Sequence, residues 1–212
     1  AQGTSRPASA VEPSSVPLFS EKRLMTDPNA TKFENVESIV SGLLKQGYIA
    51  SQQIATAIFI AENLTKPILV EGSAGVGKTE LALASAAWLD LPLIRMQCYE
   101  GLDEAKALYE WNYKKQLLRI QADRGSEASN EDWTDLQDDI FNDEFLLTRP
   151  LLEAISAEEK VVLLIDEVDR VEVETEALLL EILSDYQVSI PEMGTIEAKQ
   201  IPIVFLTSNN TR

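Results

Sequence analysis

Short apolar runs alternate with longer amphipathic stretches between residues 34 and 206, and this alternation predicts a series of strands and helices. Helices are predicted at 34–45, 51–63, 79–89 and 172–185, and strands at 68–70, 93–96, 161–165 and 203–206. Residues 102–157 are predicted to be mostly helical, and 187–196 to form a hairpin with its tip at 191–194. Apolar strands separated by helices indicate a parallel α/β sheet covered on both faces.

The domain organisation follows from the same pattern. Residues 1–30 are rich in Ser, Pro, Ala and Thr without periodicity, which predicts a flexible N-terminal tail. Residues 31–212 are predicted to form one α/β domain, since 212 residues can build one sizeable core.

Charge and composition exclude several classes of function. The chain has 35 acidic and 18 basic residues, a net charge of −17, and no basic cluster, so nucleic acid is not expected as a partner. With no histidine and only Cys98, there is no zinc ligand set, and Cys98 is expected to be a small buried side chain. No apolar run reaches the length of a membrane span, about 18 residues. A single thiol and no signal peptide favour a cytoplasmic location.

One segment is unusually acidic. Gly125 to Thr148 contains eight acids and no Lys or Arg. Charge runs of this kind usually face water, so we expect a solvated insert, and the irregular spacing of the carboxylates argues against a metal site.

A glycine-rich loop carries the strongest chemical signal. Gly72-Ser73-Ala74-Gly75-Val76-Gly77-Lys78-Thr79 fits the pattern G-x-x-x-x-G-K-[ST] between a predicted strand and a predicted helix. Glycines let the loop curl so that its N–H groups, together with the helix N-terminus, bind phosphate oxygens. We expect Lys78 to contact the β- and γ-phosphates of ATP, and the Thr79 hydroxyl to reach Mg²⁺.

Two further strands end in polar residues that suit the same chemistry. The apolar run 161–165 is followed by Asp166, a predicted Mg²⁺ ligand, and Glu167, predicted to polarise the attacking water. The strand at 203–206 leads to Asn209, predicted to contact the γ-phosphate and that water. Asn210 is adjacent, so the register of this residue is open by one, and an ordinary turn asparagine is the alternative.

Several other side chains have two interpretations. Tyr48 and Ile49 precede the helix before the glycine loop and either line an adenine pocket or pack in the ordinary way. The three tryptophans, Trp88, Trp111 and Trp133, are predicted to lie in the core or at an interface.

These motifs resemble the MoxR-type AAA+ ATPases from about Thr31 to Arg212, through G-S-A-G-V-G-K-T, L-I-D-E-V-D-R and L-T-S-N-N-T-R. The stretch from Gln97 to Gln116 is similar to the branch that matures molybdenum-containing carbon monoxide dehydrogenase. The resemblance implies a homo-hexameric ATPase with a chaperone-like role on a client metalloenzyme, and a partner with a von Willebrand factor A domain.

The family pattern continues beyond the strand at 203–206 with an arginine finger, a fifth strand and a helical lid. This sequence ends at Arg212, so we expect the C-terminal strand and lid to be absent, hydrolysis to be slow, and the apolar edge at 68–70 to favour irregular association. Two alternatives to a remodelling ATPase stay open. One is a nucleotide-sensing scaffold that does not hydrolyse ATP, and the other is a subunit of a DNA-processing machine.

Overall fold

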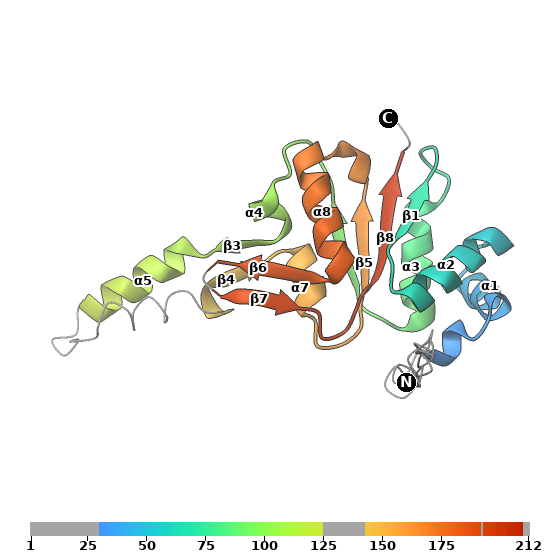
Figure 1. Ribbon diagram of the computed structural model, residues 1–212, viewed down its shortest axis with the longest axis horizontal. Helices are drawn as coiled ribbons and strands as arrows, with labels where there is room; N and C mark the ends of the chain where they lie inside the picture. Colours follow the sequence, from blue (N-terminus) through green and yellow to red (C-terminus); the bar gives the residue numbers. More distant parts are fainter. Residues whose placement is uncertain (1–29, 125–142, 192, 210–212) are drawn as a thin grey trace, which may run out of the picture.

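A central sheet of four parallel strands organises the molecule (Figure 1). The computed structural model describes residues 30–124, 143–191 and 193–209. The strands are β1 (Ile68–Glu71), β2 (Leu93–Gln97), β5 (Val162–Asp166) and β8 (Ile203–Ser208). Their spatial order is β1-β8-β5-β2, with β1 and β2 at the two edges of the described sheet. The α/β fold predicted from the sequence is confirmed, and all four predicted strands are present.

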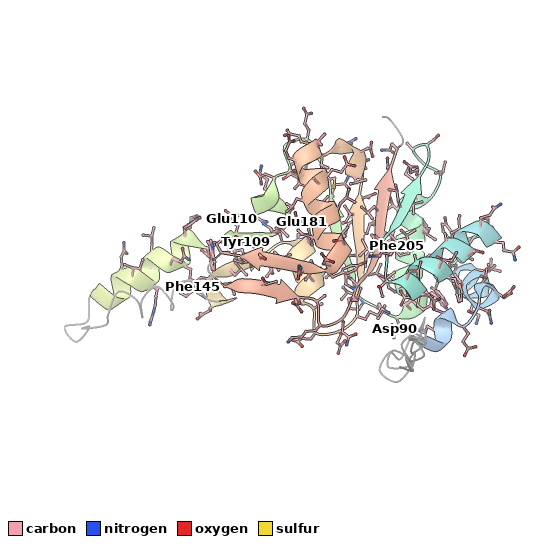
Figure 2. The ribbon with its side chains drawn as sticks, viewed as in Figure 1. Asp90, Tyr109, Glu110, Phe145, Glu181 and Phe205 are labelled. Carbon is pink, nitrogen blue, oxygen red and sulfur yellow. The ribbon has the colours of Figure 1, made fainter. Side chains whose placement is uncertain are left out.

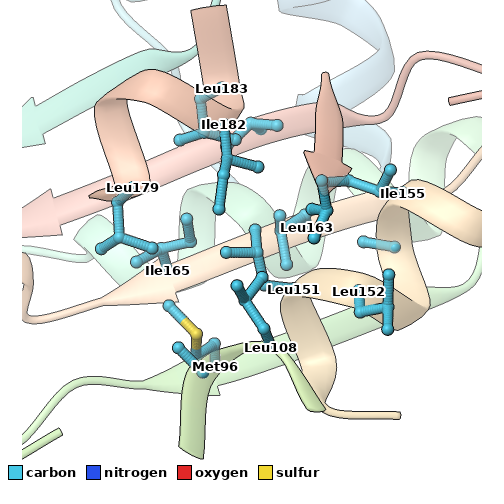
Figure 3. Close-up of a cluster of buried hydrophobic side chains, with 14 of the residues drawn as sticks. Met96, Leu108, Leu151, Leu152, Ile155, Leu163, Ile165, Leu179, Ile182 and Leu183 are labelled. Atoms are coloured by element: carbon cyan, nitrogen blue, oxygen red, sulfur yellow. The ribbon is translucent and has the colours of Figure 1, made fainter. Parts of the chain in front are cut away.

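Helices cover both faces of this sheet. Successive apolar side chains of the inner strands β5 and β8 point to opposite faces, so each face needs a layer of helices to bury it. On one face, Val162, Leu164 and Phe205 pack with α1 (Val36–Lys45), α2 (Gln52–Leu64) and α3 (Lys78–Leu89). On the other face, shown in Figure 3, Leu163 and Ile165 pack with α7 (Pro150–Ser156) and α8 (Val173–Asp185). The sheet is therefore buried on both sides, as its continuous apolar strands require.

The helices begin at residues suited to capping. Asn35 and Ser51 stand at the N-caps of α1 and α2, where their side chains accept hydrogen bonds from the N–H groups of Ser38 and Ile54. Helix α3 differs, because Gly77 at its N-cap carries no side chain that can accept such a bond.

The prediction of a mostly helical region at 102–157 is wrong in part. Between α4 (Glu104–Ala107) and α5 (Tyr113–Arg124) lies a short strand, β3 (Tyr109–Trp111). It pairs antiparallel with β4 (Leu146–Thr148), which follows the 3-10 helix η3 (Asp143–Phe145). From this pair α5 extends away from the sheet, at the left of Figure 1.

The acidic segment is also more structured at its end than expected. Phe145 is only 3% exposed and belongs to the core, and Figure 2 labels it near Tyr109 and Glu110 of β3. Burial of this aromatic side chain anchors the end of the segment to the domain, while Glu144, Leu147 and Thr148 are exposed, as expected of a segment that faces water. Residues 125–142 of the segment, and the predicted tail at 1–29, lie outside the described residues.

The remaining predicted elements are confirmed. Strands β6 (Gln187–Ile190) and β7 (Gly194–Glu197) form the hairpin, and the 3-10 helices η2 (Ala30–Phe33) and η4 (Val168–Arg170) complete the described elements. Trp111 is buried, and Trp88 packs edge-on against Phe33 with ring centroids 5.4 Å apart. Trp133 lies outside the described residues. Within the ranges that the structure describes, no helix is long and apolar enough to cross a membrane.

Candidate functional site

The loop from Gly72 to Thr79 connects β1 to α3 at the carboxyl edge of the sheet. Gly75 and Gly77 adopt φ angles of 82° and 90°, in the left-handed region that other residues rarely occupy. Ser73, Ala74 and Val76 are exposed along the loop. Because Gly77 provides no side-chain acceptor, the N-terminus of α3 is available to a phosphate group.

Lys78 lies inside this loop rather than in solvent. Its side chain is buried, and Nζ donates to the carbonyl oxygens of Gly72 at 2.7 Å and Ser73 at 2.9 Å. A third hydrogen bond, of 3.0 Å, reaches Oδ1 of Asn209, which follows β8. The ammonium group is thus surrounded by oxygen acceptors, which is the environment that phosphate oxygens would also supply.

Asp166 ends β5 directly beside α3. The Thr79 hydroxyl donates to its Oδ1 at 3.1 Å, Thr207 of β8 donates to the same oxygen, and the Arg95 guanidinium forms an ion pair with Oδ2. Burial raises the pKa of Asp166, but the hydrogen bonds from Thr207, Arg95 and Thr79 outweigh burial and hold the pKa below its ordinary value. Asp166 is therefore ionised at neutral pH.

Glu167 turns the chain sharply after β5. Its φ of 60° lies in the left-handed region, and its N–H donates to the Thr207 hydroxyl at 2.9 Å. Its Oε2 accepts a hydrogen bond from Gln97 Nε2 at 3.0 Å and lies 3.0 Å from Arg170 Nε. The carboxylate is held over the carboxyl edge of the sheet and is about one third exposed.

These groups border one cleft of about 430 Å³. Its lining comes from the glycine loop, β2 and the ends of β5 and β8, and includes Lys78, Thr79, Arg95, Gln97, Asp166, Glu167, Thr207 and Asn209. Part of a bound nucleotide would fit a cleft of this size.

The donor set also suits a magnesium–nucleotide complex. Mg²⁺ prefers oxygen ligands and is usually held by one or two protein groups together with substrate phosphates. The Thr79 hydroxyl and the Asp166 carboxylate are adjacent and supply that kind of pair. Among the described residues there is no group of three or more His, Cys, Asp or Glu side chains that could hold a metal ion without such a substrate.

Of the two residues predicted to border adenine, Tyr48 lies beside the glycine loop and Ile49 points into solvent. Tyr48 lies near the loop, because a Cβ atom on Gly77 would stand 3.7 Å from its ring, and Ile49 is 86% exposed. Burial, and then the charge of Glu80, raise the pKa of Tyr48. The alternative sensor residue, Asn210, lies outside the described residues.

Comparison with known protein families identifies this arrangement. Residues 67–212 match the AAA domain of the dynein-related subfamily, over more than half of the chain. The chain belongs to this AAA family. The matched range begins just before β1 and includes every residue of the glycine loop, the acidic pair and Asn209.

The AAA domain also has structural neighbours. A crystal structure of a candidate ATPase from Cytophaga hutchinsonii superposes with a TM-score of 0.53 at 17% identity, which supports a shared fold. The alignment covers 86% of this chain and 46% of the other, so the chain spans just under half the length of that protein. A comparison with curated proteins gave no match.

Four residues that line the cleft of this AAA domain were not predicted from the sequence: Glu80, Arg95, Gln97 and Thr207. Arg95 and Gln97 interrupt the apolar strand β2 at alternate positions, which places them on one face of the sheet beside Asp166. That alternation was a usable signal. Thr207 gave none, because a threonine at the end of an apolar strand is ordinary β-sheet composition.

Proposed function

We propose that this AAA domain binds ATP with Mg²⁺ in the cleft and hydrolyses the terminal phosphate. One observation carries the proposal: three residues that are far apart in sequence meet in the cleft. Lys78 donates a hydrogen bond to Asn209, and the next residue, Thr79, donates one to Asp166. Such a set of a buried cation, an ionised acid and a polar sensor suits phosphoryl transfer, which depends mostly on positioning and charge stabilisation.

Each side chain has a role in this proposal. The loop N–H groups and Lys78 bind the phosphates, while Thr79 and Asp166 hold the metal. Bound Mg²⁺ would neutralise charge that develops on the phosphate oxygens. Glu167 orients the attacking water and accepts its proton, and Asn209 positions that water against the γ-phosphate.

The structure bears on the choice between hydrolysis and mere sensing of nucleotide. A scaffold that only senses ATP has no need of a carboxylate at position 167. Here Glu167 borders the cleft, and Gln97 and Arg170 fix its orientation. This observation favours hydrolysis. The net charge of −17 argues against a DNA-processing machine.

We further propose that hydrolysis drives remodelling of a client protein, within a homo-hexameric ring in the cytoplasm. Support comes from the AAA family membership and from the resemblance of Gln97 to Gln116 to the maturation ATPases of molybdenum enzymes. On that resemblance the client is a metalloenzyme, and an adaptor carries a von Willebrand factor A domain.

Phosphate release by the purified chain with Mg-ATP tests the catalytic proposal, with Glu167→Gln as the matched inactive variant. Activity that is equal in both proteins would contradict it. Light scattering with and without ATP measures ring formation. For the client, Glu167→Gln is used as bait in the ATP-bound state, and a metalloenzyme that is retained with ATP and lost with ADP supports the remodelling proposal.

A further inference from the structure

Arg95 is a cation next to the acid that is proposed to bind Mg²⁺. It lies on β2, and its guanidinium forms an ion pair with Oδ2 of Asp166. The register of the parallel strands places Arg95 opposite Leu164 and Gln97 opposite Asp166, so Arg95 is the diagonal neighbour of Asp166 on the same face. Its long side chain spans that diagonal.

The hydrogen bonds of Asp166 divide between its two oxygens. Oδ1 accepts from the hydroxyls of Thr79 and Thr207, while Oδ2 accepts from Arg95 and lies 3.4 Å from Thr79 Oγ1. The two threonines already orient the carboxylate. Arg95 therefore adds charge compensation to a side chain that is only 6% exposed.

The two partners differ in freedom of movement. The Arg95 side chain is 52% exposed and lines the cleft, so its guanidinium can enter solvent at low cost. It also donates to Gln97 Oε1 at 3.0 Å, a contact that does not involve Asp166. Asp166 cannot move in the same way, because it belongs to the central strand β5.

Two cations competing for one carboxylate oxygen repel each other strongly when water is partly excluded. We propose that Arg95 is a positioning residue that occupies Asp166 in the metal-free state and is displaced when Mg²⁺ enters with the nucleotide. The ion pair compensates the charge of the buried carboxylate before the metal arrives. Mg²⁺ must therefore bind Asp166 more strongly than Arg95 does in order to displace it. This inference rests on the proposed magnesium–nucleotide site.

The test compares nucleotide affinity with Mg²⁺ and with EDTA, using a non-hydrolysable ATP analogue and calorimetry. The dissociation constant in EDTA divided by the dissociation constant in Mg²⁺ isolates the contribution of the metal, because contacts between Arg95 and phosphate affect both measurements. Arg95→Gln should increase this ratio roughly fivefold, as expected when a half-exposed ion pair no longer competes. Arg95→Lys should stay near the parent ratio because it keeps the charge.

Lys106→Gln is the matched control. Lys106 has a similar exposure and pairs with Asp103 outside the cleft, so the same loss of charge should leave the ratio unchanged. An unchanged ratio in Arg95→Gln would overturn the inference. A decreased ratio would overturn it too, because Arg95 would then assist metal binding.

Thermal unfolding supplies a second readout, for which Arg95→Met retains the aliphatic stem. Without nucleotide and metal, Arg95→Gln and Arg95→Met should unfold at a lower temperature than the parent, since Asp166 loses its counterion. With saturating Mg²⁺ and analogue the difference should disappear. A difference that persists would show that Arg95 stays on Asp166 in the loaded state.

If the parent bound no nucleotide, the proposed function itself would fail, which is a separate outcome.

Discussion

The ammonium group of Lys78 donates a hydrogen bond of 3.0 Å to the side-chain oxygen of Asn209, 131 positions away in the sequence. The bond connects the start of α3 to the residue that follows β8, and both residues line the cleft. A group that binds in the cleft beside this bond would contact both residues at once. The arrangement links phosphate binding and the proposed γ-phosphate sensor through one side chain.

Lys78→Ala should weaken ATP binding by about ten- to a hundredfold, the loss expected for one or two charge-assisted hydrogen bonds. The buried ammonium group has oxygen acceptors on three residues, and the backbone N–H groups of the loop cannot replace its charge. Calorimetry with a non-hydrolysable analogue measures the effect, and circular dichroism checks that the fold is intact. An unchanged affinity would exclude the phosphate-binding role.

Glu167→Gln should retain nucleotide and Mg²⁺ while hydrolysis falls by roughly 10²- to 10⁴-fold, the usual contribution of a general base. Asp166 and Thr79 are untouched by the change, so the proposed metal site remains. Single-turnover phosphate release and analogue binding separate the two effects. Glu181→Gln, an exposed change on α8, serves as the control. Turnover at the parent rate would assign the base to another residue.

Cys98 should react with a thiol reagent only when the protein unfolds. Burial, with the negative charges of Asp166, Asp169 and Glu167, raises the pKa of Cys98 to about 12, and its side chain is fully buried. As the only cysteine, it accounts for the whole thiol signal. Labelling at pH 8 should be slow in buffer and fast in urea, and fast labelling of the folded protein would contradict the structure.

The same thiol gives stability a pH dependence. Because the folded pKa is raised, the unfolded chain loses this proton first, at about pH 8.5. The stabilising contribution is complete below that value and is lost as the pH rises toward 12. Urea unfolding between pH 8 and 10 should show the parent losing more stability than Cys98→Ala.

An ion pair at the opposite end of β5 should matter for stability alone. Lys160 Nζ lies 2.7 Å from Glu62 Oε1, and the two side chains are 10% and 12% exposed. Removing one partner, as in Lys160→Met, should destabilise the protein by up to about 3 kcal/mol, because the remaining charge is largely shielded from water. The double variant with Glu62→Leu should recover part of that loss in urea unfolding. If the two losses simply added, the pair would not be coupled.

The sequence was most informative where one local pattern determines both structure and chemistry. The pattern of the glycine loop predicts a turn between a strand and a helix, because the left-handed positions of that turn admit few residues other than glycine. The apolar run before Asp166 likewise predicts a buried strand with acids at its end. Each of these predictions needs only neighbouring residues.

Predictions failed where a contact depends on distant residues. Strands β3 and β4 have three residues each, too few to show a period of their own, and they pair although residues 112–145 lie between them in the sequence. The ion pair of Arg95 with Asp166 follows from the register between β2 and β5, and a sequence does not give that register. Ile49 illustrates a different limit, since its apolar side chain is left exposed among the described residues.

The contact between Gly42 and Trp88 restricts how this sequence can drift. Glycine inside α1 costs the helix about 1 kcal/mol relative to alanine, yet a Cβ atom at position 42 would stand 2.2 Å from the indole ring on α3. Gly42 therefore cannot be exchanged for a larger residue while Trp88 is present. In descendants of this protein, a bulkier side chain at position 42 would have to arrive with a smaller one at position 88. Substitutions at the two positions should therefore covary among related sequences, although 46 positions separate them in the chain.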